Sequence, residues 1–245
     1  MPTDLLIDIG HSRIKWACAV DGRLVIETAG QAGVGLFEQL EQIVRRHAPV
    51  RRAVLCAQSR RATVEAITAR LAQCQVDIDI IASGDRLLPV TPAYPGLGCD
   101  RWLALQWPWQ QSRGALLVAD CGSALTIDLV DTSGRHLGGW IMAGLHAARD
   151  GLLARAPGLA GEPCGEFMAG RPARTTAAAV AAGGWLQLAG AIEFACDRAG
   201  GLLDDHIDVW ITGGDAPGLA GVLRQPAHHD PYLVLRGLAM AAKTT

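Results

Sequence analysis

The sequence carries almost no net charge: 22 basic and 24 acidic residues leave a formal charge of −2 over 245 residues. Proteins that bind the nucleic-acid backbone need an excess of positive charge, so this balance predicts no nucleic-acid partner. The arginine pairs Arg45-Arg46, Arg51-Arg52 and Arg60-Arg61 do not change that expectation. Acidic and polar residues surround them, which is typical of solvated helix ends.

The seven cysteines form no Cys-x-x-Cys pair, their number is odd and their spacing is wide. Zinc sites and disulfide frameworks usually show closely spaced or even-numbered cysteines, so neither is expected. We expect most of these cysteines to be buried thiols in a reducing compartment.

The chain also lacks the apolar runs that signal peptides and membrane spans need. Met1-Pro2-Thr3-Asp4 contains no basic residue, and the apolar run after it is only a few residues long. No stretch approaches the roughly 20 apolar residues that cross a bilayer. We therefore expect a cytoplasmic protein without a membrane partner, with enough chain for one large domain or two lobes with substantial cores.

Two segments of the chain share one pattern. Leu5–Lys15 and Leu116–Asp128 each contain an apolar run, then Asp-x-Gly, then small hydroxylated residues and a second β-like run. This pattern predicts a buried strand, a tight turn and a returning strand. Glycine permits close approach of a ligand, and turn amides with hydroxyls can bind phosphate oxygens. The repetition predicts two similar half-domains that face each other across a nucleotide cleft.

The remaining periodicity predicts a mixed-sheet α/β fold with two tightly joined lobes, at 1–112 and 113–245. Ordered or irregular loops are expected at 92–98 and 156–173. The helix at 101–110 contains three tryptophans, which we expect to pack in the core rather than to stack on a base. The expected strands are 5–9, 14–20, 24–29, 53–57, 78–81 and 209–211, with others from 115 to 141. The expected helices are 35–48, 63–73, 101–110, 144–155, 176–198 (broken or closely packed at Gly183-Gly184) and one that begins near 233.

Three further features favour phosphate chemistry. Asp8-Ile9-Gly10-His11-Ser12-Arg13-Ile14-Lys15 combines turn amides, a hydroxyl and a positive charge, as a phosphate cradle requires. Thr212-Gly213-Gly214-Asp215 follows a strand and would suit the approach of an adenosine. Asp100 either caps a helix or accepts the proton of an attacking hydroxyl, and both can hold at once. Arg101 beside it can clamp a carboxylate or phosphate through paired hydrogen bonds.

Taken in their order along the chain, the motifs of this sequence resemble those of the type III pantothenate kinase family. Some relatives in that family are described as Bvg accessory factors. The resemblance covers about residues 4 to 242, and its motifs are specific in combination. They are Asp8-Ile9-Gly10 with Lys15, Gly98-Cys99-Asp100-Arg101, Asp120-Cys121-Gly122-Ser123-Ala124 with Thr126 and Asp128, Gly138-Gly139-Trp140-Ile141 with Gly144-Leu145, Thr212-Gly213-Gly214, and Leu233-Val234-Leu235-Arg236-Gly237-Leu238.

The resemblance implies two duplicated actin- and ribonuclease-H-like lobes with mixed sheets around an ATP cleft. It implies transfer of the ATP γ-phosphoryl group to pantothenate, giving 4'-phosphopantothenate in the first step of coenzyme A synthesis. It also implies a homodimer, Mg²⁺ or another divalent cation with the nucleotide, and a monovalent cation, K⁺ or NH₄⁺.

The resemblance also assigns roles to individual residues. By motif, Asp100 matches the catalytic base and Asp120 the ligand of the monovalent cation. The residues that match pantothenate contacts are Tyr94, Gly98, Cys99, Asp100, Arg101 and Thr176. Those that match ATP contacts are Asp8, Ile9, Gly10, His11, Ser12, Arg13, Ile14, Lys15, Ser123, Gly213 and Gly214.

Four positions depart from the family pattern. His11 stands where asparagine is usual, Ser12 and Ser123 stand where threonine is usual or common, and Ala143 replaces the proline that usually precedes Gly144. Imidazole cannot both donate and accept as an amide does, so ATP binding is expected to be weaker or to depend on pH near neutrality. The loss of proline is expected to make the turn at Gly144 less rigid.

Two other functions stay open beside pantothenate phosphorylation. The chain could phosphorylate another small hydroxylated metabolite on the same fold, because residue spacing does not identify a substrate. It could also be a nucleotide-binding regulatory protein without catalysis. The presence of Asp8, Asp100 and Asp120 argues against the regulatory alternative, and the absence of a DNA-binding motif argues against direct DNA contact.

Overall fold

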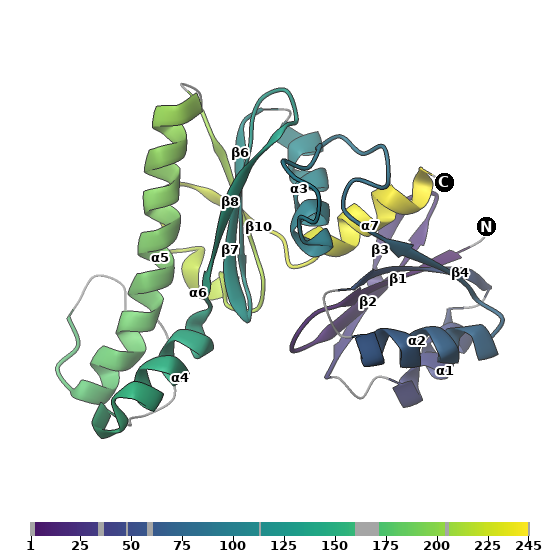
Figure 1. The fold of residues 1–245 in the computed structure, drawn as a ribbon, viewed down its shortest axis with the longest axis horizontal. Coiled ribbons are helices and arrows are strands. Elements are labelled where there is room, and N and C mark those ends of the chain that lie inside the picture. The colour runs from purple at the N-terminus through teal and green to yellow at the C-terminus, as the bar shows by residue number, and fades with distance from the viewer. Residues whose placement is uncertain are drawn as a thin grey trace. The chain divides into compact units, whose positions relative to one another are not determined.

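The computed structural model describes residues 3–33, 37–47, 49–57, 61–112, 114–159, 172–203 and 206–244. The chain divides into two compact units: Met1–Gln111 with Tyr232–Thr245, and Ser112–Pro231. Each unit holds one five-stranded sheet (Figure 1). The mixed α/β fold expected from the sequence is confirmed.

The first unit is built on a sheet of strand order β3-β2-β1-β4-β5. The first three strands form an antiparallel meander, and β1, β4 and β5 run parallel. Asp21 and Gly22 both have positive φ at the β2–β3 turn, as expected for an Asp-Gly hairpin. The strands are β1 (Thr3–Ile9), β2 (Ile14–Val20), β3 (Arg23–Ala32), β4 (Val50–Ala57) and β5 (Asp77–Ile81).

Helices cover both faces of this sheet. Figure 1 shows α1 (Phe37–Arg46) and α2 (Arg61–Gln73) on one face and α7 (Leu233–Lys243) on the other. Apolar side chains from β1, β4, α1 and α2 form one buried cluster, which includes Leu5, Ile7, Leu40, Leu55, Ile67 and Leu71. Helix α3 (Cys99–Ser112) begins two residues before its expected start at about Arg101 and so includes the Asp-Arg pair.

The last helix belongs to the first unit, whereas the sequence-based division assigned residues 232–245 to the second lobe. The reason lies in two close contacts of α7. Gly237 packs so tightly on α3 that a Cβ there would overlap the carbonyl of Leu103. The Arg52 guanidinium donates to Ala242 O at 2.7 Å while it pairs with Asp4. Side chains distant in sequence therefore tie α7 to β1 and β4.

The second unit repeats the strand arrangement of the first. Its sheet has the order β10-β9-β6-β7-β8. Strands β6, β7 and β8 form an antiparallel meander, and β6, β9 and β10 run parallel, so each strand has a counterpart in the first sheet. The duplication expected from the two Asp-x-Gly segments is confirmed. The strands are β6 (Leu116–Cys121), β7 (Ala124–Val130), β8 (His136–Ala143), β9 (Asp208–Thr212) and β10 (Ala227–His229).

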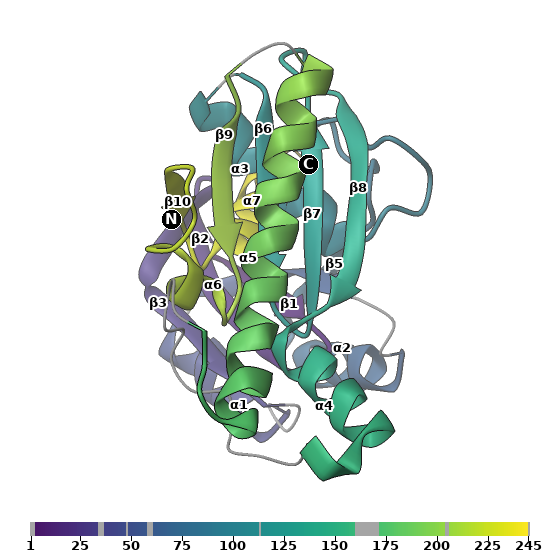
Figure 2. The ribbon, with the colours of Figure 1, turned by 90° about the vertical axis from the view of Figure 1, so that its left-hand side faces the viewer.

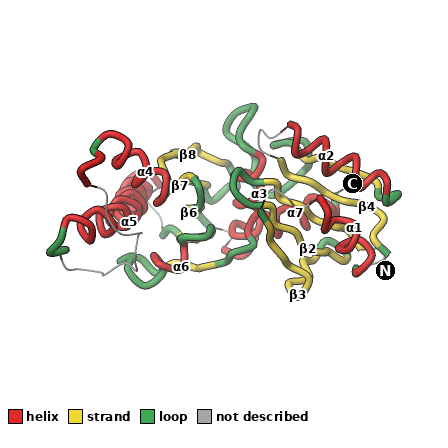
Figure 3. The backbone as a smooth tube through the Cα atoms, turned by 90° about the horizontal axis from the view of Figure 1, so that it is seen from below, coloured by secondary structure: helices red, strands yellow, loops and turns green. Residues whose placement is uncertain are grey.

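One long helix, α5 (Thr176–Leu203), lies along one face of the second sheet (Figure 2). Next to it is α4 (Leu145–Arg155), on the same side of the sheet (Figure 3). Helix α5 is continuous through Gly183-Gly184, and a Cβ at Gly184 would lie 2.8 Å from Leu145 Cδ1. Of the two expected roles of this glycine pair, close packing is the one observed.

Three short elements were not expected from the sequence. They are a 3-10 helix, η1 (Pro157–Leu159), the four-residue helix α6 (Ala216–Leu219), and the edge strand β10. The first falls in the region expected as a loop, most of which, residues 160–171, lies outside the described part of the chain.

By length and composition, α5 is long and apolar enough to cross a membrane, contrary to the expectation that no stretch approaches such a span. In its most apolar stretch of 18 residues, only 33% is buried inside the structure. Its buried residues, Trp185, Leu188 and Ile192 among them, belong to the core cluster of the second unit. Helix α5 therefore covers the sheet with one face and leaves an apolar face exposed.

Candidate functional site

The β1–β2 connection forms the first expected phosphate turn. Gly10 N donates to Arg13 O at 3.1 Å, which closes a tight turn between the two strands. The three residues inside the turn, His11, Ser12 and Arg13, are exposed. Asp8 and Lys15 are register partners on the two strands, so a carboxylate and an ammonium flank the base of the turn.

The β6–β7 connection is the counterpart in the second unit. Gly122 N donates to Ala124 O at 3.0 Å, and Ser123 is exposed between them. Gly144 N donates to Ser123 O at 3.3 Å, and a Cβ at Gly144 would come within 2.7 Å of the same oxygen. The β8–α4 junction therefore supports this turn, and glycine is required there whether or not a proline precedes it.

The glycine-rich turn after β9 reaches the same end of the second sheet. Gly213 has φ of 96°, and a Cβ there would lie 2.6 Å from Asp120 Oδ1 and would overlap the Cys121 carbonyl. Asp215 N donates to that carbonyl at 3.0 Å. Burial, followed by the negative charges of Asp120 and Asp215, raises the pKa of the Cys121 thiol well above its usual range. The structure thus brings together Asp120, Ser123 and Gly213 at one end of the second sheet.

The Asp-Arg segment begins α3. Asp100 Oδ1 accepts a hydrogen bond from Arg101 N at 2.7 Å, and a negative charge at this end of a helix is favourable. The Arg101 side chain is mostly buried, and its Nη1 donates to the Tyr94 hydroxyl at 3.2 Å. Asp100 is therefore the second residue of α3, in its first turn and not at the cap position, next to a cation and an aromatic side chain.

Asp8 and Asp100 approach the same end of the first sheet. Cys56 on β4 is the register partner of Asp8 on one side and of Ile81 on the other. The Cys99 thiol donates to Ile81 O at 3.0 Å, which seats the start of α3 over these strand ends. A hydrogen bond with Cys99, then burial, then the charges of Asp8 and Asp100 raise the pKa of the Cys56 thiol.

Thr176 lies apart from the other predicted residues of the second unit. It is the exposed first residue of α5. Gly184, which packs on Leu145 beside the Gly144 junction, lies about 12 Å further along the same helix. Within the second unit, Thr176 therefore lies away from Asp120 and from the turns at Ser123 and Gly213.

Sequence reasoning missed one buried polar residue near this segment. Gln106 on α3 is fully buried, and its side chain binds both the N–H and the C=O of Val90. A single glutamine within a helix is usually solvated, so nothing in the local pattern marks it. Trp102 packs in the core as expected, with its indole N–H donating to Val90 O at 2.8 Å.

Most of the described cysteines are buried, as expected. All but Cys74 are buried, and none of those in the described ranges forms a disulfide. Cys164 lies outside the described residues. Among the residues that the structure covers, no three His, Cys, Asp or Glu side chains cluster as metal ligands would.

Comparison with known proteins identifies the family. Residues 4–198 match the family model described as type III pantothenate kinase. The chain belongs to this family. It is 34% identical to the type III pantothenate kinase of Nitrosococcus oceani, over 98% of this chain and 94% of that protein. It is also 34% identical to that of Pseudomonas paraeruginosa, over 97% and 98% of the two chains. The resemblance drawn from the motifs is confirmed.

Solved structures show the fold that this pantothenate kinase family member shares with others. A Campylobacter jejuni protein described as a Baf family transcriptional activator has a TM-score of 0.63 at 21% identity, covering 98% of this chain and 97% of that one. A ROK family glucokinase from Streptomyces griseus, solved with glucose and AMPPNP, has a TM-score of 0.53 at 10% identity and 98% coverage of both chains. The two-lobed kinase-like fold expected from the sequence is confirmed.

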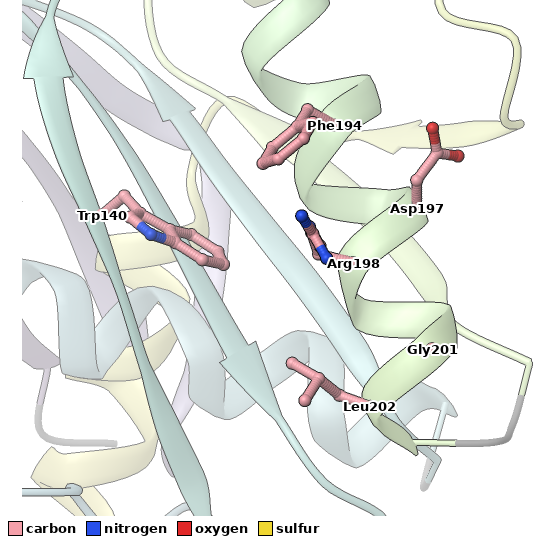
Figure 4. A pocket seen from close by; sticks show the side chains of 6 residues that line it. All are labelled: Trp140, Phe194, Asp197, Arg198, Gly201 and Leu202. Carbon is pink, nitrogen blue, oxygen red and sulfur yellow. The ribbon is translucent and has the colours of Figure 1, made fainter.

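A separate groove lies on the second unit, between β8 and α5 (Figure 4). Its volume is about 450 Å³, and it is mainly apolar. The Arg198 guanidinium lies 5.1 Å from the centre of the Phe194 ring on its wall. No residue matched to ATP or pantothenate contacts in this family member lines it. The lining residues are Trp140, Phe194, Asp197, Arg198, Gly201 and Leu202.

Proposed function

We propose that this chain transfers the γ-phosphoryl group of ATP to the primary hydroxyl of pantothenate in the cytoplasm. The products are 4'-phosphopantothenate and ADP, and the reaction is the first step of coenzyme A synthesis. The observation that carries the proposal is the arrangement of Asp100, Arg101 and Tyr94 at the start of α3, in a chain of this family.

Asp100 acts as the general base. As the pantothenate hydroxyl oxygen attacks the γ-phosphorus, its proton passes to the Asp100 carboxylate, the new P–O bond forms and the bond to ADP breaks. The hydrogen bond from Arg101 N holds the carboxylate at the helix start. A carboxylate held in the first turn of a helix by a backbone amide is ordered before substrate binds, which favours catalysis by positioning.

The acceptor site takes pantothenate beside this base. Arg101 pairs with the pantothenate carboxylate, because a guanidinium fork matches a carboxylate in both charge and shape. Tyr94 lies against the substrate from the loop that its hydrogen bond with Arg101 orders. Gly98 and Cys99 form the backbone wall beside them, and Thr176 contributes a hydroxyl.

ATP binds to the two Asp-x-Gly turns and the glycine turn after β9. The amides of the turn from Asp8 to Lys15 and the Ser123 hydroxyl receive phosphate oxygens. Lys15 neutralises part of their charge. Gly213 and Gly214 present backbone without side chains, as close approach of adenosine needs.

Two kinds of cation accompany the nucleotide. Mg²⁺ is usually held by substrate phosphates and one or two carboxylates rather than by a protein cage, and Asp8 fits that need. Asp120 fits K⁺ or NH₄⁺, because its carboxylate lies beside the backbone carbonyl of Cys121 and oxygen donors suit such cations. When bound, these cations offset the negative charge of the phosphates.

The working unit is a homodimer, with the groove between β8 and α5 at its interface. Exposed apolar patches larger than those of ordinary monomers mark interaction sites. The large apolar side chains that line this groove and are exposed are Trp140, Phe194 and Leu202. A second copy is the partner that would cover the apolar face of α5, which also begins at Thr176.

A coupled assay of ADP release, run with and without pantothenate, tests the function. Mass spectrometry of the product accompanies it. We expect ADP release that depends on pantothenate and a product heavier by one phosphoryl group. ATP binding without transfer to pantothenate would support the regulatory alternative. Transfer to a different hydroxylated metabolite from a panel of sugars and short acids would identify another kinase.

A further inference from the structure

The segment between β5 and α3 carries Tyr94, and α3 holds it from one side. Arg101 donates to the Tyr94 hydroxyl at 3.2 Å, and Trp102 donates to Val90 O at 2.8 Å. One turn further along the same helix, Gln106 also reaches Val90. This segment, residues 82–98, is called the acceptor loop. It has two attachments to α3, one at Tyr94 and one at Val90, four residues before Tyr94.

Gln106 binds Val90 as a neighbouring strand would. Its Oε1 accepts from Val90 N at 2.9 Å, and its Nε2 donates to Val90 O at 3.3 Å. The same Nε2 also donates to Trp102 O at 2.9 Å. The side chain is fully buried, where an amide without partners would be costly. A carboxamide carries an acceptor oxygen and a donor NH₂ side by side, which matches the N–H and C=O of a single residue.

The sequence after Val90 can transmit this restraint to Tyr94. Pro92 lies between Val90 and Tyr94, and Pro95 follows Tyr94 directly. Each proline fixes its own φ and restricts the residue before it, so the dihedrals of Thr91 and Tyr94 are limited. A short loop of this kind is stiff, and holding the backbone of Val90 narrows the directions in which the Tyr94 ring can project.

We propose that Gln106 is a positioning residue of the acceptor site: it fixes Val90, and through the stiff loop it sets Tyr94 against Arg101. The inference rests on the proposed function and deepens it, because it concerns affinity for the acceptor and not for ATP. Trp102 assists through the same carbonyl of Val90.

The test compares Gln106→Leu with Gln110→Leu. Both substitutions are nearly isosteric and lie on α3, but Gln110 is exposed and serves as the matched control. We expect Gln106→Leu to raise KM for pantothenate by about tenfold, with kcat and KM for ATP within about twofold of the wild type. Gln110→Leu should leave all three constants within about twofold.

A second variant, Trp102→Phe, removes the indole donor together with part of the buried ring, and should raise KM for pantothenate by less than Gln106→Leu. Hydrogen exchange of the peptide that spans residues 87–98 gives a readout without substrate. Exchange should be faster in Gln106→Leu than in Gln110→Leu, while the peptides of β1 and β6 stay unchanged.

The outcomes separate the inference from the function on which it rests. A wild-type enzyme that does not phosphorylate pantothenate removes the proposed function, and the exchange data then decide whether Gln106 holds the loop. If Gln106→Leu lowers the melting temperature but leaves KM for pantothenate at the control value, Gln106 is structural only. An equal rise in both KM values likewise overturns the inference.

Discussion

At the scale of single residues, Gly213 shows how tightly the second unit constrains its nucleotide turn. Its φ of 96° is strained for any residue with a Cβ, and the space that a Cβ needs is filled by Asp120 and the Cys121 carbonyl. A side chain at this position would have to displace the carboxylate that we assign to the cation.

Gly213→Ala is therefore expected to lower the melting temperature and to raise KM for ATP. The control is Gly190→Ala, which lies on exposed α5 with open space around it. That change should stabilise the protein slightly, by up to about 1 kcal/mol, because alanine favours helix over glycine. Thermal melting and steady-state kinetics check both, and equal melting temperatures for the two variants would contradict the steric argument.

Asp100→Asn tests the base. The amide is close in size and shape to the carboxylate, and it can still accept from Arg101 N, so the fold should persist. We expect kcat to fall about 100- to 10,000-fold, as for the loss of a general base. The measurement is pantothenate-dependent ADP release by protein of wild-type melting temperature. Turnover within about threefold of the wild type would remove Asp100 from this role.

At the scale of elements, three separate connections meet at the end of β6. The turn at Gly122-Ser123, the junction at Gly144 and the turn at Gly213 contact one another through backbone atoms. Where two backbone segments come this close, there is no room for a Cβ, so glycine is needed. The glycines of the sequence therefore indicated where these connections meet, although each motif alone is common. Carbonyl and carboxylate oxygens gathered there also explain why a cation should bind.

Activity is expected to require a monovalent cation at this junction. The Asp120 carboxylate would otherwise repel the phosphates of ATP, and a bound cation reverses that local field. Rates should be high in K⁺ or NH₄⁺ buffer and low in Na⁺ or Tris buffer. Asp120→Asn should lose this difference between buffers. Equal wild-type rates in all four buffers would show that no such cation is used.

The element pattern was predictable where periodicity is strong and local. The two strand–turn–strand segments and helices α2, α3 and α4 lie close to their expected bounds. Elements without local signals were missed: β10 has three residues and α6 has four. The attachment of α7 to the first unit depends on Gly237 meeting Leu103, a contact over more than a hundred residues. The role of Gln106 likewise depends on Val90, which only the folded loop brings to α3.

At the scale of the molecule, the two units have equivalent strand arrangements but different coverings. The first sheet is covered on one face by α1 and α2 and on the other by α7, whereas α4 and α5 share one face of the second. Helix α5 buries only part of its apolar surface there. A helix that is apolar nearly all round is stable in water only when something covers its second face.

A homodimer that covers this face is the last expectation. Light scattering at low micromolar protein should give about twice the 25.8 kDa of one chain, and pantothenate with ATP should stabilise that state by mass action. Phe194→Asp should shift the mass to that of the monomer, because a charge would be buried in the groove. Ile26→Asp, at an exposed position on β3 of the first unit, is the control and should remain dimeric. A wild-type mass near that of one chain with full specific activity would show that the monomer works alone, and the apolar face of α5 would then need another partner.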